Sequence, residues 1–243
     1  MIFVTLGCFL VPQKYPGNID EVIANVFNWK HTYNSETWFL FPYVMLSLTA
    51  VLIIKLINKA GMGISLSMVG VIYLLTTFLL SRYGGYVNTN MLLYQPLVYF
   101  NLLFSFVLGI FLHRNGTDLW KYFDPLSGRL SLVLIVILMI VRCSFSTMVL
   151  DPFYSLFFIL FFVRIKLWRK IDFVFKTMGD SSKLLWMIHT FFCYYLFHDF
   201  IYGFKYPVLI FIVLVLITYL ISLPIDIVCR KIIGLLGYKS RKK

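Results

Sequence analysis

The feature that most constrains the fold is a long segment near the C-terminus, residues 206–225, in which no side chain carries a charge. A helix crosses the hydrocarbon core of a bilayer with about 20 such residues. Six further runs reach or approach this length, so that the full set is 38–56, 64–81, 94–112, 130–148, 153–165, 184–202 and 206–228. The sequence therefore predicts an all-α, polytopic transmembrane helical bundle of about seven spans.

The amino-acid composition excludes an ordinary soluble protein. Of the 243 residues, 60% are apolar and 13% are charged, whereas a soluble domain is about half apolar and about a quarter charged. A domain of this length cannot bury such an excess of apolar residues. Because aromatic and aliphatic residues dominate along the whole chain, a disordered or nucleic-acid-binding tail is also excluded. The four cysteines have no CxxC spacing and no nearby ligand set, so we expect packing residues rather than disulfides or a metal site.

The positions of the basic residues predict the orientation in the membrane. Most of the 22 Lys and Arg fall in one alternate set of loops, including a dense block at 164–183 and the C-terminal tail. The opposite loops hold only Lys14, Lys30, Arg82 and Lys205. Because cytoplasmic loops are enriched in Lys and Arg, we expect a cytoplasmic C-terminus and an external segment before the first span. The net charge of +12 is therefore interpreted first as a sign of membrane topology and not of nucleic-acid binding.

The N-terminal residues 1–11 are apolar but too short to span a bilayer, and no basic residue precedes them. A signal peptide is therefore not expected. We interpret this segment as the outer end of a span whose beginning is absent, so that N-terminal helices would be missing. The predicted organisation is one integral membrane domain, 1–243, with an external segment 1–36 and a basic cytoplasmic tail 229–243.

Polar side chains within the apolar runs are candidates for function, because such groups are costly inside a membrane. Arg142 lies about two turns from the outer end of its predicted span. It either holds an anionic group or a polarised carbonyl in a cavity, or it snorkels outward or pairs with Asp151. His189 lies about a turn and a half into the sixth span. It is either a hydrogen-bonded packing residue or an acid-base group. His198 and Asp199 end that span, but adjacent helical residues do not face each other.

The polar and aromatic segment 30–38, before the first span, has two interpretations. Its Trp and Tyr either anchor the chain at the membrane interface or bind a sugar by ring stacking and hydroxyl hydrogen bonds. No Walker motif, HExxH or GxSxG occurs in the chain. ATP-driven transport and the familiar serine and zinc hydrolases therefore have no support.

Residues 178–189, MGDSSKLLWMIH, resemble the late signature of the acyltransferase 3 family. In that family a Gly, a Ser three residues on, an aromatic residue seven on and a His ten on open a late transmembrane helix. This spacing is matched by Gly179, Ser182, Trp186 and His189. Residues 36–43, ETWFLFPY, are similar to the family's Trp-Phe-Leu and Tyr pattern at the start of a middle helix.

The resemblance implies about ten spans with both ends cytoplasmic, so a seven-span chain with an external start would lack about three helices. It implies transfer of an acyl group, often acetyl, from an acyl-CoA donor to a carbohydrate hydroxyl at a bacterial inner membrane. Family members carry an Arg and a His regarded as catalytic in a first helix, followed by a basic pair near the donor site. None of these residues has a counterpart in this chain.

On this resemblance, the residues expected to be catalytic are His189, for donor-side positioning or acid-base work, and Arg142, for polar stabilisation. The residues expected to bind substrate are Glu36, Trp38, Tyr43 and Ser182. The basic block 164–183 either attracts the phosphates of CoA or only marks the cytoplasmic side beside anionic lipid. The expected partners are acyl-CoA, a carbohydrate acceptor and the lipid bilayer, with no nucleic acid and no metal.

Three alternatives remain open at the level of the sequence. The chain is a catalytically inactive fragment, or a subunit whose partner chain supplies the missing helices, or a polysaccharide transporter. A transporter should show paired broken helices with charged residues near the middle of the membrane. Only Arg142 meets that description, so transport is the weaker alternative.

Overall fold

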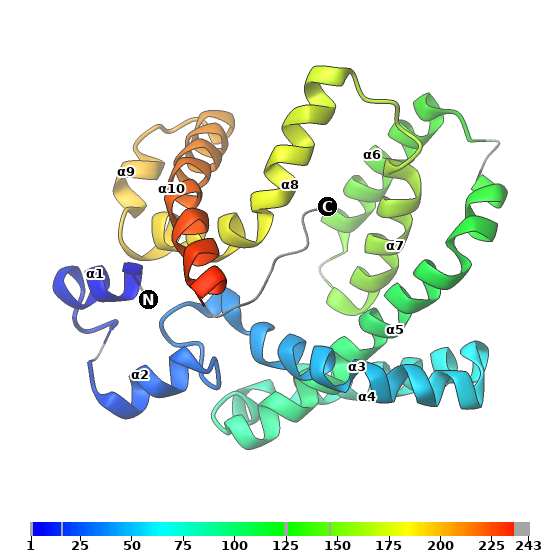
Figure 1. Cartoon of the computed structure of the whole chain (residues 1–243), viewed down its shortest axis with the longest axis horizontal. Coiled ribbons are helices and arrows are strands. Elements are labelled where there is room, and N and C mark those ends of the chain that lie inside the picture. Colours follow the sequence, from blue (N-terminus) through cyan, green and yellow to red (C-terminus); the bar gives the residue numbers. More distant parts are fainter. Residues whose placement is uncertain (1, 16, 124–125, 146, 236–243) are drawn as a thin grey trace. The chain divides into compact units, whose positions relative to one another are not determined.

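The computed structural model describes residues 2–15, 17–123, 126–145 and 147–235. Every regular element within these residues is helical, which confirms the all-α fold class (Figure 1). The expected basic tail continues beyond residue 235, and that part lies outside the described residues. The elements are α1 (Ile2–Leu10), α2 (Ile19–Val26), η1 (Ser35–Thr37), α3 (Leu40–Ala60), α4 (Met62–Val87), α5 (Met91–Phe123), α6 (Gly128–Ser144), η2 (Met148–Leu150), α7 (Asp151–Phe162), α8 (Arg169–Thr190), η3 (Phe191–Tyr195), α9 (His198–Tyr202) and α10 (Pro207–Leu235).

The chain forms two compact units. The terminal unit contains Met1–Trp38 and Trp168–Lys243, and therefore α1, α2, η1, α8, η3, α9 and α10. The central unit contains Phe39–Leu167, and therefore α3 to α7. The single domain expected over 1–243 stays a prediction.

Four helical segments in the described residues are long and apolar enough to cross a membrane: Ser35–Ala60, Met62–Val87, Met91–Gly116 and Pro207–Leu235. They coincide with four of the predicted runs. Many of their apolar side chains point outward, including Leu48, which is 73% exposed, and Val208, which is 72% exposed. Since a large apolar side chain left in water forgoes about 1.5–3 kcal/mol of burial energy, these surfaces are suited to lipid.

The fourth and fifth predicted spans form shorter helices than expected. Helix α6 has 17 residues and ends at Ser144 because Phe145 is extended and Thr147 caps η2 by accepting a hydrogen bond from Val149 N. Helix α7 has 12 residues and is therefore about 18 Å long, which is less than the hydrocarbon thickness of about 30 Å. These two helices pack against each other as a hairpin in the central unit.

The sixth predicted span, 184–202, is not one helix, and that prediction is wrong. Helix α8 begins at Arg169, so most of its length comes from the basic block. It ends at Thr190 and continues as η3, a single π-helical turn over Phe191–Tyr195. The chain then leaves helical geometry at Phe197 before the five-residue α9. The residues at the break are themselves apolar, and their aromatic rings are buried within the terminal unit. Apolar content alone therefore did not reveal the break.

The core of the central unit lies between α4 and α5. Tyr73 stacks on Phe104 with ring centroids 5.1 Å apart, and the Tyr73 hydroxyl donates to the Val149 carbonyl at 3.0 Å. The Asn101 amide donates to Thr77 Oγ1 at 2.8 Å. These pairs satisfy polar groups inside an otherwise apolar helix bundle, as a membrane protein requires.

The core of the terminal unit joins the N-terminal segment to η3. Tyr15 is 1% exposed and packs beside Tyr33 and Phe191. Phe3 of α1 stacks on Phe191 with ring centroids 5.0 Å apart. A Cβ atom at Gly7 would overlap the Tyr15 ring, so glycine is what permits this close approach of α1.

Candidate functional site

The candidate site is built on one face of α8. Positions 179, 182, 186 and 189 are spaced by three or four residues, which places them along one stripe of a helix. Trp186 and His189 confirm this geometry, because their ring centroids are 5.4 Å apart. Ser182 Oγ donates to the Gly179 carbonyl at 2.7 Å, so this hydroxyl hydrogen-bonds within its own helix.

A backbone contact sets the tautomer of His189. Its Nδ1 lies 2.6 Å from the Trp186 carbonyl oxygen. A carbonyl oxygen only accepts hydrogen bonds, so Nδ1 carries the proton and the neutral ring has its lone pair on Nε2. The side chain is half-buried near the end of α8. The site therefore contains an oriented imidazole whose Nε2 is the basic nitrogen.

The segment Asn34–Glu36 packs against this end of α8. The Asn34 amide donates to the Met187 carbonyl at 2.9 Å, and Thr190 Oγ1 donates to Asn34 Oδ1 at 3.1 Å. Asn34 is 8% exposed and Thr190 is fully buried, so both contacts are shielded from solvent. Trp186 Nε1 donates to the Glu36 carbonyl at 3.4 Å. The structure thus brings the expected substrate-binding Glu36 beside Trp186, next to the expected catalytic histidine.

A hydroxyl pair extends this contact to η3. Ser35 Oγ and the Tyr195 hydroxyl are 2.7 Å apart. Asn34 also accepts a hydrogen bond from Glu36 N at 3.1 Å, which is a local turn typical of Asn. Sequence reasoning missed Asn34, Thr190 and Tyr195, because their contacts join segments far apart in the chain.

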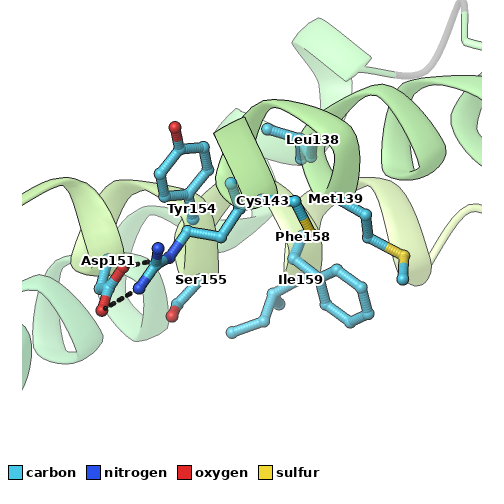
Figure 2. Close-up of a pocket in the computed structure, with 9 residues that line it drawn as sticks. Leu138, Met139, Cys143, Asp151, Tyr154, Ser155, Phe158 and Ile159 are labelled. Atoms are coloured by element: carbon cyan, nitrogen blue, oxygen red, sulfur yellow. Dashed lines mark hydrogen bonds and ion pairs between the residues drawn. The ribbon is translucent and has the colours of Figure 1, made fainter. Parts of the chain in front are cut away.

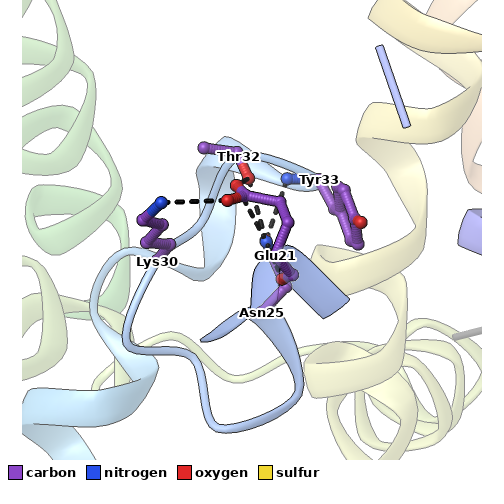
Figure 3. Close-up of polar contacts among 5 residues, drawn as sticks. All are labelled: Glu21, Asn25, Lys30, Thr32 and Tyr33. Carbon is purple, nitrogen blue, oxygen red and sulfur yellow. Dashed lines mark hydrogen bonds and ion pairs between the residues drawn. The ribbon is translucent and has the colours of Figure 1, made fainter. Parts of the chain in front are cut away.

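A cluster around Glu21 fixes the segment that leads to Asn34 (Figure 3). Lys30 Nζ lies 2.9 Å from Glu21 Oε2, and Thr32 Oγ1 donates to Glu21 Oε1. Asn25 Nδ2 donates to Thr32 Oγ1 at 2.9 Å, and Tyr33 N donates to Asn25 Oδ1 at 3.0 Å. The hydrogen bond from Thr32, followed by that from Lys30, lowers the pKa of Glu21 below 4.5. Lys30 and Thr32, at the start of the polar and aromatic segment 30–38, thus contact Glu21. A role of that segment in sugar binding stays a prediction.

Two other expected substrate-binding residues belong to segments other than α8. Trp38 ends the terminal unit and is 36% exposed. Tyr43 lies on α3 in the central unit and is 51% exposed. Their roles stay predictions.

Arg142 lies in the last turn of α6, nearer the helix end than expected. Its Nε is 2.7 Å from Asp151 Oδ1, and Nη2 donates to Asp151 Oδ2 at 3.3 Å. Its Nη1 donates to the Phe145 carbonyl at 2.8 Å. The expected alternative of pairing with Asp151 is therefore confirmed (Figure 2). The structure does not bring Arg142 and His189 into one compact unit, and a catalytic role for Arg142 stays a prediction.

His198 contacts its neighbour, contrary to the expectation for adjacent helical residues. Its Nδ1 lies 3.1 Å from Asp199 Oδ1. Both residues belong to the first turn of α9, and the Asp199 side chain is fully exposed. Among the described residues, no group of three His, Cys, Asp or Glu is arranged to bind a metal ion.

Comparison with known proteins gives a family match over most of the chain. The family model described as an acyltransferase domain, that of the acyltransferase 3 family, matches residues 1–227. No curated protein and no solved structure matches the chain. The match covers α8 and the segment Asn34–Glu36, and so includes the whole candidate site.

Proposed function

The chain belongs to the acyltransferase 3 family, and from this premise we propose that it is a membrane O-acyltransferase using His189 as its base. The donor in this proposal is acyl-CoA, with acetyl as the acyl group, and the acceptor is a hydroxyl of a cell-surface carbohydrate. The observation that carries the proposal is the contact between His189 Nδ1 and the Trp186 carbonyl, since it leaves Nε2 as the basic nitrogen.

The proposed reaction is a direct transfer. Nε2 of His189 accepts the proton of the sugar hydroxyl while the hydroxyl oxygen attacks the thioester carbonyl carbon. The new C–O ester bond forms, the C–S bond breaks, and the proton held by His189 passes to the departing CoA sulfur. The Trp186 carbonyl stabilises the imidazolium formed on the way, because it accepts the hydrogen bond from Nδ1–H throughout.

The proposed acceptor site lies along the stripe of α8. The Trp186 ring is 49% exposed and offers a flat apolar surface on which a sugar ring stacks. Glu36 is half-buried beside Trp186, and its carboxylate accepts hydrogen bonds from sugar hydroxyls in this proposal. Ser182, Trp38 and Tyr43 complete the set of proposed substrate-binding residues.

We propose that the protein resides in a bacterial inner membrane with its C-terminus in the cytoplasm. The distribution of basic residues supports this orientation, because the block 164–183 and the tail carry most of the positive charge. In this orientation the basic block meets the phosphates of a cytoplasmic CoA donor.

Acetyl transfer by isolated membranes tests the proposal. Membranes containing the chain are incubated with radiolabelled acetyl-CoA, and glycan is extracted and counted. We expect label in the glycan that mild alkali releases, as an ester requires, and none above background in matched membranes without the chain. Equal labelling in both preparations would contradict the proposed activity.

A further inference from the structure

An open pocket of about 580 Å³ lies between α6 and α7 in the central unit (Figure 2). Its volume falls within the range of about 300–1,000 Å³ that small-molecule sites occupy. Its lining includes Met139, Arg142, Asp151, Ser155, Phe158 and Ile159.

The polar and apolar parts of this pocket are separated along the helix hairpin. The ion pair joins the last turn of α6 to the first residue of α7, so it lies at the end where the two helices connect. Met139 lies about one turn away along α6, and Phe158 and Ile159 lie about two turns away along α7. These three side chains are 58%, 41% and 47% exposed. The pocket thus has charges at one end and apolar walls deeper along the hairpin.

The ion pair keeps capacity to bind a ligand. A guanidinium has five N–H donors, and hydrogen bonds of Arg142 to Asp151 Oδ2 and the Phe145 carbonyl use two of them, both on the terminal nitrogens. The fifth donor, on Nε, belongs to the nitrogen that lies 2.7 Å from Asp151 Oδ1 in the ion pair. The remaining two N–H groups, one on each terminal nitrogen, fit two oxygens of a phosphate. Asp151 Oδ2, which accepts one hydrogen bond from Arg142, likewise retains lone-pair capacity for a hydrogen bond from an ammonium group. Both side chains are about two-fifths exposed.

We propose that this pocket binds a zwitterionic phospholipid of the phosphatidylethanolamine type. Its phosphate lies at Arg142, its ammonium at Asp151, and one acyl chain runs along Met139, Phe158 and Ile159. The helix pair favours such a lipid because charges of both signs lie at the hairpin end and exposed apolar side chains continue from them along the two helices. An anionic headgroup fits less well, since the Asp151 carboxylate repels it.

Native mass spectrometry of the full chain tests this assignment. The detergent-solubilised protein is exposed to an equimolar mixture of dioleoyl phosphatidylethanolamine and dioleoyl phosphatidylglycerol, which share the same acyl chains. We expect retention of phosphatidylethanolamine to exceed that of phosphatidylglycerol by about threefold, the effect of one partly exposed ion pair. Equal retention of the two lipids, or preference for phosphatidylglycerol, overturns the proposal.

Two variants and a control make the test specific. Asp151→Asn leaves Arg142 uncompensated, so we expect the preference to reverse toward phosphatidylglycerol. Ser155→Trp fills the pocket from an exposed position and lowers retention of both lipids. Asp226→Asn alters a comparable ion pair on α10, Asp226 with Arg230 at 2.6 Å, and leaves the lipid ratio unchanged. If Asp151→Asn retains the two lipids in the same ratio as the original chain, the lipid proposal is overturned. This outcome is independent of whether acyl transfer is observed.

Discussion

Two buried side chains determine how the segment before the first span meets the end of α8. Asn34 donates to one backbone carbonyl of α8 and accepts from the hydroxyl of Thr190, so each polar group satisfies the other. These contacts hold Glu36 beside Trp186, whose carbonyl orients His189. The geometry of the proposed base therefore depends on residues that do not themselves react.

Replacing Asn34 by Ala removes the acceptor of the buried Thr190 hydroxyl and one donor to the Met187 carbonyl. We expect a loss of about 1–3 kcal/mol in the free energy of unfolding, the usual cost of an unsatisfied buried polar group. Denaturant unfolding of the detergent-solubilised protein measures this change. The matched control is Asn58→Ala, because Asn58 is exposed and its side chain accepts a hydrogen bond from the exposed Arg114. Equal losses in the two variants would contradict the account.

The Glu21 cluster predicts a pH dependence of stability. The pKa of Glu21 in the folded protein lies below its ordinary value of 4.5, chiefly because of the hydrogen bond from Thr32. The ionised carboxylate therefore stabilises the fold above pH 4.5, and this contribution is lost as the pH falls through the lowered pKa. We expect Glu21→Gln to lower the melting temperature at pH 6, and we expect the difference from the original chain to shrink as the pH falls below 4.5 and through the lowered pKa. A difference in melting temperature that grows as the pH falls would contradict this prediction.

At the scale of elements, the long apolar helices were predictable and the broken one was not. The runs that became α3, α4, α5 and α10 have a continuous apolar composition, which is itself sufficient to predict a spanning helix. The π-helical turn after α8 depends instead on contacts with the N-terminal segment, such as Phe3 stacked on Phe191. The Arg142–Asp151 pair was predictable because only nine residues separate its members.

Helix α1 gives a test of that tertiary contact. Gly7→Ala places a methyl group against the buried Tyr15 ring, and we expect a loss of about 1–3 kcal/mol in the free energy of unfolding. Gly63→Ala is the matched control, since nothing lies within 4 Å of its added Cβ and Ala favours the helix. Thermal unfolding of both variants measures the difference. Unchanged stability in Gly7→Ala would show that α1 does not pack on Tyr15.

At the scale of the whole molecule, the family match identifies the chain as a member of the acyltransferase 3 family. The distribution of basic residues predicts its orientation in the membrane. The match covers both compact units. Motif spacing in the sequence suggested His189, but it did not predict that the segment Asn34–Glu36 packs against the end of α8. That contact joins residues about 150 positions apart, and no local pattern encodes it.

Native cysteines test the proposed orientation. Cys143 lies at the end of α6 predicted to face outward, whereas Cys229 lies in the part of α10 predicted to face the cytoplasm, and both are exposed. In single-cysteine variants, we expect a membrane-impermeant maleimide to label Cys143 in intact spheroplasts and Cys229 only in inverted vesicles. A variant retaining only the buried Cys193 serves as the unreactive control. Labelling of Cys229 in intact spheroplasts would reverse the topology.

The initial rate of acetyl transfer in a His189→Asn variant tests the central claim most directly. Asparagine retains a donor for the Trp186 carbonyl but lacks a basic nitrogen, so the variant separates catalysis from packing. With equal amounts of each chain in the membrane, we predict a fall of about 10²–10⁴-fold in glycan labelling, while His198→Asn keeps the original rate. An unchanged rate in His189→Asn would contradict the assignment of His189 as the base.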